Sequence, residues 1–286
     1  MSSSQSKNFV STQWLSQNLK SPDLAIIDGS WHLPPLKRDA RAEYLAAHIP
    51  GAVFFNIDEI ADTASGLPHM MPQPLQFASQ MKDLGLGDGM RFVVYDQSGL
   101  FSAPRVWWML KSFGVTDVKI LEGGLPKWVA EGRETDSGPV HRTPRVFTPR
   151  LDHSAVATLD DVAKASASGS AQIIDARPAD RFRGEAPEPR AGVASGHIPG
   201  SLNLPFPQIS ENGQLKSAQD IAKAFVDAGA DLSKPIITSC GSGVSASILA
   251  VALEEAGHKV KSIYDGSWAE WGSVAGQPVT TGKSKP

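Results

Sequence analysis

Cysteine is almost absent from this sequence: of its 286 residues, only Cys240 is a cysteine. One thiol can form neither an internal disulfide nor a zinc site built from several cysteines. The length allows a sizeable hydrophobic core instead, and at about 100–200 residues per domain it predicts two globular domains. Whatever chemistry Cys240 performs, no second cysteine of the same chain takes part.

Blocks of positive charge and long apolar runs are missing as well. With 27 Lys and Arg against 30 Asp and Glu, the net charge is −3, so nothing favours nucleic acid as a partner. No apolar run approaches the about 20 residues that cross a bilayer. The polar residues 1–8 lack the apolar stretch of a signal peptide. We therefore expect a soluble, cytoplasmic protein that binds neither nucleic acid nor a membrane.

The chain does contain an internal repeat. The tetrapeptide His-Ile-Pro-Gly occurs at residues 48–51 and again 149 positions later, at residues 197–200. Three apolar runs and one tryptophan recur in the same order, at separations of 143 to 147 residues; these landmarks are residues 24–28 and 171–175, 91–96 and 235–240, 119–124 and 262–267, and Trp128 and Trp271. Four landmarks in order indicate two homologous domains. We place the domains at residues 8–138 and 155–284, with a linker at residues 139–154.

The repeated runs predict the fold class. They are short, rich in Ile and Val, and bounded by Gly, Pro and Asp, which is typical of buried parallel strands. Residues 103–113 and 246–256 have apolar side chains at helical spacing and stop at Gly114 and Gly257. Strands that alternate with helices predict an α/β fold in which each domain has a mainly parallel sheet flanked by helices. The proline-containing residues 134–153 have no period and predict an extended connection.

Cys240 lies between one of these runs and the helix expected from about Ala246. Such a strand–loop–helix turn directs backbone N–H groups and the positive end of the helix into the loop, where they bind an anion. Gly241 and Gly243 let the backbone curl around the sulfur. Most single cysteines are buried apolar residues, but this setting favours a reactive thiolate.

The repeat, the Cys240 loop and the closing tryptophans resemble the two-domain rhodanese superfamily of sulfurtransferases over about residues 8–280. The loop Cys-Gly-Ser-Gly-Val is similar to that of the 3-mercaptopyruvate sulfurtransferases, with Ser245 where threonine is usual. The resemblance implies two tandem rhodanese-like domains. It also implies that the first is catalytically silent, because Asp96 aligns with Cys240 there.

Residues 181–190 are rich in turn formers and predict a loop. In the family, the first and last arginines of a matching segment hold the carboxylate and keto oxygens of the donor, which implies these roles for Arg181 and Arg190. Guanidinium groups suit the task because they bind planar oxyanions with two hydrogen bonds and stay charged. With them, Gly241, Gly243 and Val244 of the cysteine loop are assigned to donor binding. Arg183 matches no such role.

The family resemblance also implies a proton relay. Asp58 and His69, eleven residues apart, match the family pair that acts with the serine two residues after the cysteine, here Ser242. A histidine titrates near neutral pH and a carboxylate would orient it, so the residue types suit proton transfer. Sequence alone does not bring His69 to Ser242.

The resulting hypothesis is a transfer of sulfur from 3-mercaptopyruvate to a thiol, thioredoxin or cyanide through a Cys240 persulfide, with release of pyruvate and without a metal or organic cofactor. Two alternatives stay open: a thiosulfate sulfurtransferase, and a non-catalytic persulfide carrier. Cysteine phosphatases share the loop but need an arginine where this chain has Ala246. We interpret His48, His197, Trp107 and Trp108 as structural residues, because both domains contain the histidine and the tryptophans lie on an apolar helix face.

Overall fold

A computed structural model describes residues 6–284 of the chain. Residues 1–5, most of the polar start for which no signal peptide was expected, lie outside the described residues. The chain divides into two compact units: the first contains residues 6–62, 71–152 and 212–214, and the second contains residues 63–70, 153–211 and 215–284. Residues 63–70 thus belong to the second unit although the sequence around them belongs to the first, and residues 212–214 belong to the first unit although the sequence around them belongs to the second. Within residues 6–284, no helix is both long and apolar enough to cross a membrane.

Each unit is built on a five-stranded sheet. In the first the order is β1-β5-β4-β2-β3, and in the second it is β6-β12-β11-β7-β8. The strands of the first sheet are β1 (Phe9–Val10), β2 (Leu24–Asp28), β3 (Val53–Phe54), β4 (Arg91–Tyr95) and β5 (Val118–Leu121). Those of the second are β6 (Val156–Ala157), β7 (Gln172–Asp175), β8 (Leu202–Asn203), β11 (Ile236–Ser239) and β12 (Ser262–Tyr264). All neighbouring strands pair in parallel, which confirms the α/β fold class and the internal repeat.

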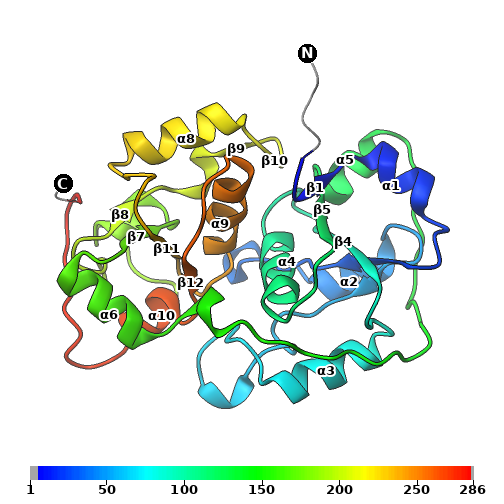
Figure 1. Ribbon diagram of the computed structural model, residues 1–286, viewed down its shortest axis with the longest axis horizontal. Coiled ribbons are helices and arrows are strands. Elements are labelled where there is room, and N and C mark those ends of the chain that lie inside the picture. Colours follow the sequence, from blue (N-terminus) through cyan, green and yellow to red (C-terminus); the bar gives the residue numbers. More distant parts are fainter. Residues whose placement is uncertain (1–5, 285–286) are drawn as a thin grey trace. The chain divides into compact units, whose positions relative to one another are not determined.

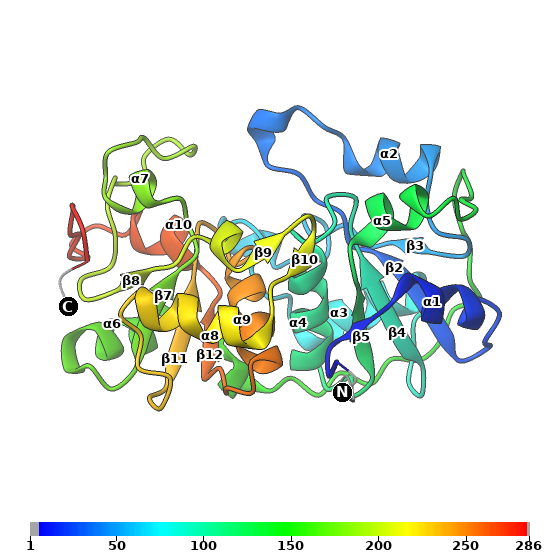
Figure 2. The same ribbon diagram turned by 90° about the horizontal axis from the view of Figure 1, so that it is seen from above.

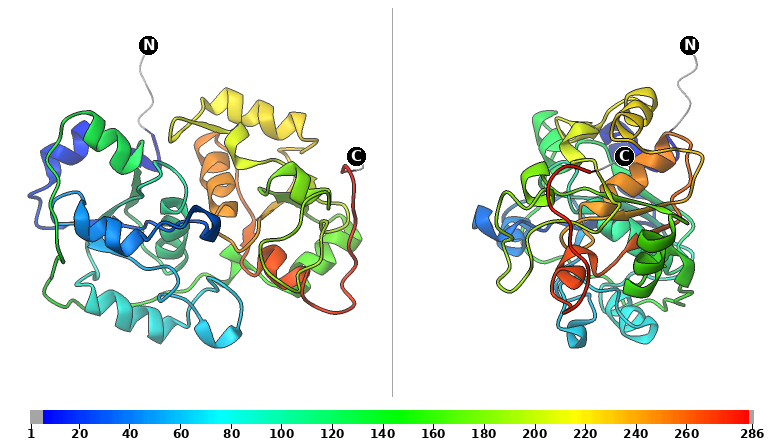
Figure 3. Two further views of the ribbon diagram at one scale, coloured as in Figure 1. Left: turned by 180° about the vertical axis from the view of Figure 1, so that it is seen from behind. Right: turned by 90° about the vertical axis from the view of Figure 1, so that its left-hand side faces the viewer.

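Helices cover both faces of the first sheet (Figures 2 and 3). They are α1 (Thr12–Asn18), α2 (Ala40–Ala46), α3 (Pro74–Asp83), α4 (Ala103–Ser112) and α5 (Gly124–Ala130). Leu15 of α1 and Trp128 of α5 pack with Ile26 and Val93 on one face. On the other side, α4 contacts β4 and β5, and its Trp107 and Trp108 are only 1% and 5% exposed. These tryptophans are therefore core residues, as the sequence indicated.

The second sheet is covered in the same way (Figure 1). Its helices are α6 (Leu159–Ser168), α7 (Ala179–Phe182), α8 (Ala218–Asp227), α9 (Ala246–Glu255) and α10 (Ser267–Trp271). Val162 of α6 and Trp268 and Trp271 of α10 pack with Ile173 and Ile237 on one face. Helix α9 packs against β11 and β12, and α8 packs against α9. A further pair of strands, β9 (Ser210–Glu211) and β10 (Gln214–Leu215), precedes α8.

Local sequence explains where the two helices expected from periodicity end. The structure has them at α4 and α9, each within one residue of the predicted end. Gly114 and Gly257 follow with φ of 91° and 83°, and glycine adopts this left-handed conformation without a steric cost. Both predicted helices are therefore confirmed.

The extended connection follows the surface of the first unit. Backbone N–H groups of Arg150 and Asp152 donate to the carbonyls of Phe113 and Ser112, and Asp88 N–H donates to Val146 O. Residues 137–152 contain no helix or strand, but residues His153–Ala155 form a single 3₁₀ turn where the sequence predicted none. Backbone hydrogen bonds thus attach this connecting segment to the first unit.

Candidate active site

Cys240 lies in the turn between β11 and α9, as the sequence predicted. Its residue is 2% exposed, and it directly follows the last residue of β11. Backbone N–H groups of Trp268 and Ala269 in α10 donate to the carbonyls of Cys240 and Gly241 at 2.9 Å. Gly243 has φ of 76°, a conformation that favours glycine. The loop is therefore fixed through its carbonyls by the first turn of α10.

Ser267 binds the same loop through the loop's backbone N–H groups. Its Oγ accepts hydrogen bonds from the N–H groups of Cys240 and Gly243, at 3.2 and 3.1 Å, and donates to Tyr264 O at 2.7 Å. Ser267 is completely buried and has φ of 49°, which is unusual for a residue with a side chain. In the first unit, Gly124 stands at the equivalent position with φ of 53°. The hydroxyl at this position thus distinguishes the cysteine-bearing unit from the other.

The first unit shows what such a loop binds. Asp96, the counterpart of Cys240, is 1% exposed, and its carboxylate accepts four backbone N–H groups at 2.7 to 2.9 Å. The four donors are Ser98, Phe101, Ser102 and Ala103. A carboxylate is stable in this position because N–H groups at a helix start supply partial positive charge. The loop of the first unit therefore binds the anionic end of the side chain at position 96. In the second unit the side chain at the equivalent position is that of Cys240.

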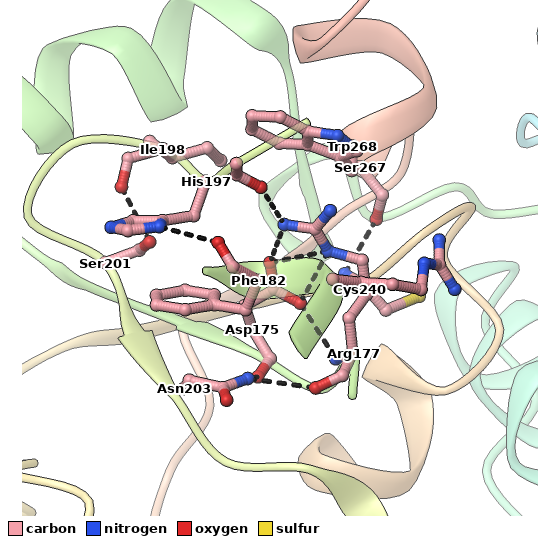
Figure 4. A network of polar contacts seen from close by, with 12 residues as sticks. Asp175, Arg177, Phe182, His197, Ile198, Ser201, Asn203, Cys240, Ser267 and Trp268 are labelled. Atoms are coloured by element: carbon pink, nitrogen blue, oxygen red, sulfur yellow. Dashed lines mark hydrogen bonds and ion pairs between the residues drawn. The ribbon is translucent and has the colours of Figure 1, made fainter. Parts of the chain in front are cut away.

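Arginines surround the cysteine loop on the side of β7. Arg177 is 2% exposed and donates from Nε and Nη2 to Asp175 Oδ2 at 2.9 and 2.7 Å (Figure 4). Burial by itself lowers the pKa of Arg177, but the Asp175 carboxylate and its hydrogen bonds outweigh burial and raise it, and the charges of Glu188 and Cys240 act in the same direction. The guanidinium of Arg177 also stacks over Trp268, with 4.4 Å from its Cζ to the ring centre. Arg177 is thus a fixed cation near the sulfur.

Arg181 is placed beside the cysteine loop. A Cβ atom added to Gly241 would stand 3.6 Å from Arg181 Nη2. The prediction of a loop over residues 181–190 is wrong at its start, because Arg181 and Phe182 form the end of helix α7. Pro178 begins this turn with a suitable φ of −52° and Asp180 lies in it, which favours a helix start. Arg190 lies at the other end of the segment and is partly exposed.

His69 and Ser242, 173 residues apart, come together in the second unit. His69 Nδ1 lies 3.1 Å from Ser242 Oγ and 3.3 Å from Ser242 O, and both residues are buried. His69 has φ of 62°, a left-handed conformation in which histidine occurs more often than most residues. Asp58 belongs to the first unit, where it accepts a hydrogen bond from Trp31 Nε1 at 3.1 Å.

The two repeated histidines stabilise the fold. His48 Nδ1 and His197 Nδ1 each lie 2.8 Å from a backbone carbonyl, of Tyr44 and Phe182, and each ring stacks on the ring of that residue. Their backbones pair with Asp136 and Thr280. A carbonyl can only accept, so Nδ1 donates in both cases. The structural interpretation of these histidines is confirmed.

Comparison with known proteins agrees with this architecture. The family model described as "Rhodanese-like domain" matches residues 11–131 and 158–273. The chain belongs to the rhodanese family.

Curated relatives of this rhodanese-family protein are similar over nearly their whole length. The chain is 44% identical to the 3-mercaptopyruvate sulfurtransferase of Escherichia coli (strain K12), covering 95% of this chain and 97% of the relative. It is 43% identical to the human 3-mercaptopyruvate sulfurtransferase (92% and 91%) and 40% identical to the thiosulfate sulfurtransferase of Gallus gallus (92% and 92%). The crystal structure of SseA from Escherichia coli matches with a TM-score of 0.85 at 42% identity, covering 91% of this chain and 98% of that one. The chain is therefore an enzyme, a sulfurtransferase.

Sequence reasoning missed three residues of this rhodanese-family site: Arg177, Glu188 and Ser267. An arginine two residues after the buried strand that ends in Asp175 was a usable signal, since a charge there needs a partner. The exchange of Gly124 for Ser267 between the two repeats was another. Among residues 6–284, no group of three or more His, Cys, Asp or Glu side chains is arranged to hold a metal ion.

Proposed function

We propose that this sulfurtransferase takes sulfur from 3-mercaptopyruvate and passes it to a small nucleophile through a persulfide on Cys240. The Cys240 thiolate attacks the thiol sulfur of the donor, and a sulfur–sulfur bond forms. The carbon–sulfur bond breaks, its electron pair remains on carbon as the pyruvate enolate, and the proton lost by the persulfide converts the enolate into pyruvate. A thiol, thioredoxin or cyanide then attacks the outer sulfur and regenerates the thiolate.

The observation that supports this function most strongly is the place of Cys240 in the repeat. Four N–H groups bind the Asp96 carboxylate in the first unit, and two of them belong to Ser102 and Ala103 at the start of α4. Ser245 and Ala246 stand at the equivalent start of α9, directly after the Cys240 loop. An anionic outer sulfur on Cys240 is the group such a loop would stabilise, by preorganised N–H donors of the oxyanion-hole kind. The enzyme thus needs no group beyond its own loop to hold the persulfide.

Roles for the surrounding side chains follow from their chemistry. Arg181 and Arg190 bind the carboxylate and keto oxygens of the donor, and Gly241, Gly243 and Val244 give the loop backbone access to it. Ser242 and His69, which lie within hydrogen-bond distance of one another, deliver the proton to the enolate carbon. Asp58 is proposed as the third member of this relay, and Asp58→Asn is expected to slow pyruvate release.

Replacement of the nucleophile tests the function directly. Cys240→Ser is expected to abolish pyruvate release from 3-mercaptopyruvate, measured with lactate dehydrogenase and NADH, while its circular dichroism stays that of the wild type. Arg190→Gly is expected to lower kcat/KM chiefly through KM. Retained turnover in Cys240→Ser would disprove the persulfide route, and an unchanged kcat/KM in Arg190→Gly would remove its assignment.

Thiosulfate is the second donor to test, because the thiosulfate sulfurtransferase of Gallus gallus is 40% identical to this chain. The neutral residues 241–245 favour 3-mercaptopyruvate, since dianionic thiosulfate would bind better beside basic side chains. Both donors are compared at equal concentration with cyanide as acceptor and thiocyanate as the product measured. A higher kcat/KM for thiosulfate would reverse the donor assignment, and less than a few equivalents of thiocyanate per chain would indicate a carrier instead of an enzyme.

A further inference from the structure

Glu188 is a nearly buried carboxylate that joins two arginines beside the cysteine loop. Its side chain is 4% exposed. Oε1 accepts from Arg177 Nη1 at 2.8 Å and from Arg181 Nε at 3.3 Å, and Oε2 accepts from Arg181 Nη2 at 2.5 Å. The contact with Arg181 thus involves two guanidinium nitrogens and both carboxylate oxygens, the geometry that restrains an arginine most strongly.

Glu188 is itself held by a rigid support. Arg177 donates to it with Nη1 and uses Nε and Nη2 for Asp175, at the end of β7, and Nη2 also for the carbonyl of Gly196 at 2.8 Å. Figure 4 shows the guanidinium of Arg177 between Asp175 and Trp268, with Cys240 close by. Because Arg177 is buried and each of its three guanidinium nitrogens makes a hydrogen bond, it fixes the position of the Glu188 carboxylate relative to the sheet.

Arg181, in contrast, is on the accessible side of this network. Its side chain is 20% exposed, and its Nη2 reaches the cysteine loop near Gly241. A free arginine side chain loses rotamer entropy when a ligand orders it, and this loss weakens binding. An arginine already ordered by Glu188 loses less of this entropy on binding, so it binds a donor oxyanion more tightly.

Glu188 also balances charge within this cluster and determines which N–H groups of Arg181 face away from it. The cluster contains two cations, Arg177 and Arg181, and two carboxylates, Asp175 and Glu188. Asp175 and Glu188 thus offset the two guanidinium charges. The Arg181 guanidinium keeps unpaired N–H positions only on the side away from Glu188, because its Nε and Nη2 bond the carboxylate.

From this arrangement we infer that Glu188 is a positioning residue for the donor-binding step: it holds the Arg181 guanidinium beside the Cys240 loop in the orientation that receives the donor. This inference rests on the proposed function, because it takes Arg181 to bind the donor. It assigns no contact between Glu188 and the donor, and it leaves the transfer of sulfur from Cys240 to the acceptor independent of Glu188.

The test separates the two half-reactions. In rapid-mixing experiments with the full chain, the half-saturating concentration of 3-mercaptopyruvate for the pyruvate burst is expected to rise about 10-fold or more in Glu188→Gln, a typical effect of removing an ionic hydrogen bond. Discharge of the preformed persulfide by cyanide should stay within twofold of the wild type. Glu188→Asp should restore part of the donor affinity, since it retains the charge.

Glu185→Gln is the matched control. Glu185 lies in the same segment and pairs with Arg183 at 2.6 Å, but it is 56% exposed. Loss of this exposed pair should leave both half-reactions unchanged. In an Arg181→Ala background, Glu188→Gln should have no further effect on donor affinity, because its partner has gone.

The outcomes are distinct. If wild-type protein releases no pyruvate, the proposed function fails and not the role of Glu188 alone. If the wild type does and Glu188→Gln binds the donor as well as the wild type, the inference is overturned. It is likewise overturned if Glu188→Gln slows cyanide discharge as much as it weakens donor binding, or if its effect persists in full without Arg181. If Glu188→Gln does not fold, donor affinity and cyanide discharge are measured in Glu188→Asp instead, and the same results overturn the inference.

Discussion

The hydroxyl of Ser267 offers a sharp test of how the cysteine loop is held. Ser267→Ala removes the acceptor of two backbone N–H groups, of Cys240 and Gly243, in a completely buried place. Leaving a buried donor unbonded costs about 1–3 kcal/mol each, and small shifts of the loop recover part of it. We expect Ser267→Ala to lower the free energy of unfolding by about 2–4 kcal/mol.

Ser267→Gly separates these hydrogen bonds from backbone strain. It loses the same hydroxyl, but it also relieves the positive φ of 49°, which costs a residue with a Cβ about 1–2 kcal/mol. Glycine has more conformational freedom in the unfolded chain, and this lowers the stability of Ser267→Gly by about 0.4–1 kcal/mol. Ser267→Gly should therefore be about 0.5–1 kcal/mol more stable than Ser267→Ala. Gly124 with φ of 53° at the equivalent position of the first unit shows that glycine suits this turn.

Urea unfolding followed by tryptophan fluorescence measures both variants, since Trp268 and Trp271 are buried in the same helix. Ser273→Ala is the control: its Oγ makes a single bond to Ala269 O, and its loss should cost less than about 1 kcal/mol. A Ser267→Ala protein within about 0.5 kcal/mol of the wild type would refute the hydrogen-bond argument. A Ser267→Gly protein less stable than Ser267→Ala would refute the strain argument.

Further predictions use the repeat and the pKa of one histidine. Asp175→Asn should destabilise by about 3–5 kcal/mol in urea unfolding, because it leaves the buried Arg177 without its main partner. At the equivalent position Asp28 accepts from the backbone N–H of Ser30, and an amide oxygen can replace this acceptor, so Asp28→Asn should change stability by less than about 1 kcal/mol. Equal losses in the two variants would contradict this. Burial lowers the pKa of His197, so the unfolded chain binds a proton first and stability should fall as pH drops below about 6.5 towards the folded pKa. His197→Asn keeps an N–H for the Phe182 carbonyl and should show a flatter dependence between pH 7.5 and 5.5; a parallel dependence would show that another group titrates.

The pattern of apolar runs determined the fold class of this protein. The short apolar runs, the helical spacing of residues 103–113 and 246–256, and the glycines that follow them are local signals, and each depends on residues a few positions apart. The same is true of the Cys240 loop, which a strand, two glycines and a helix start define within about ten residues. These features were predictable because their physical cause lies in the neighbouring sequence.

Only the tertiary structure decided which distant polar groups meet. That His69 reaches Ser242 across 173 residues, and that Ser267 accepts N–H groups of the cysteine loop, depends on how the strands order themselves in the sheet. The loop prediction is wrong at Arg181 and Phe182, the end of α7, because the nearby proline and glycine indicate turns without specifying which turn is helical.

The single cysteine shows both sides of this division. The sequence by itself determined that Cys240 stands alone, in the second of two repeats and at the start of a helix. The structure decided its surroundings: a buried arginine and carboxylate network on one side and a serine that ties the loop on the other. Such surroundings come from segments far apart in the chain, and only close packing of the folded unit sets their distances.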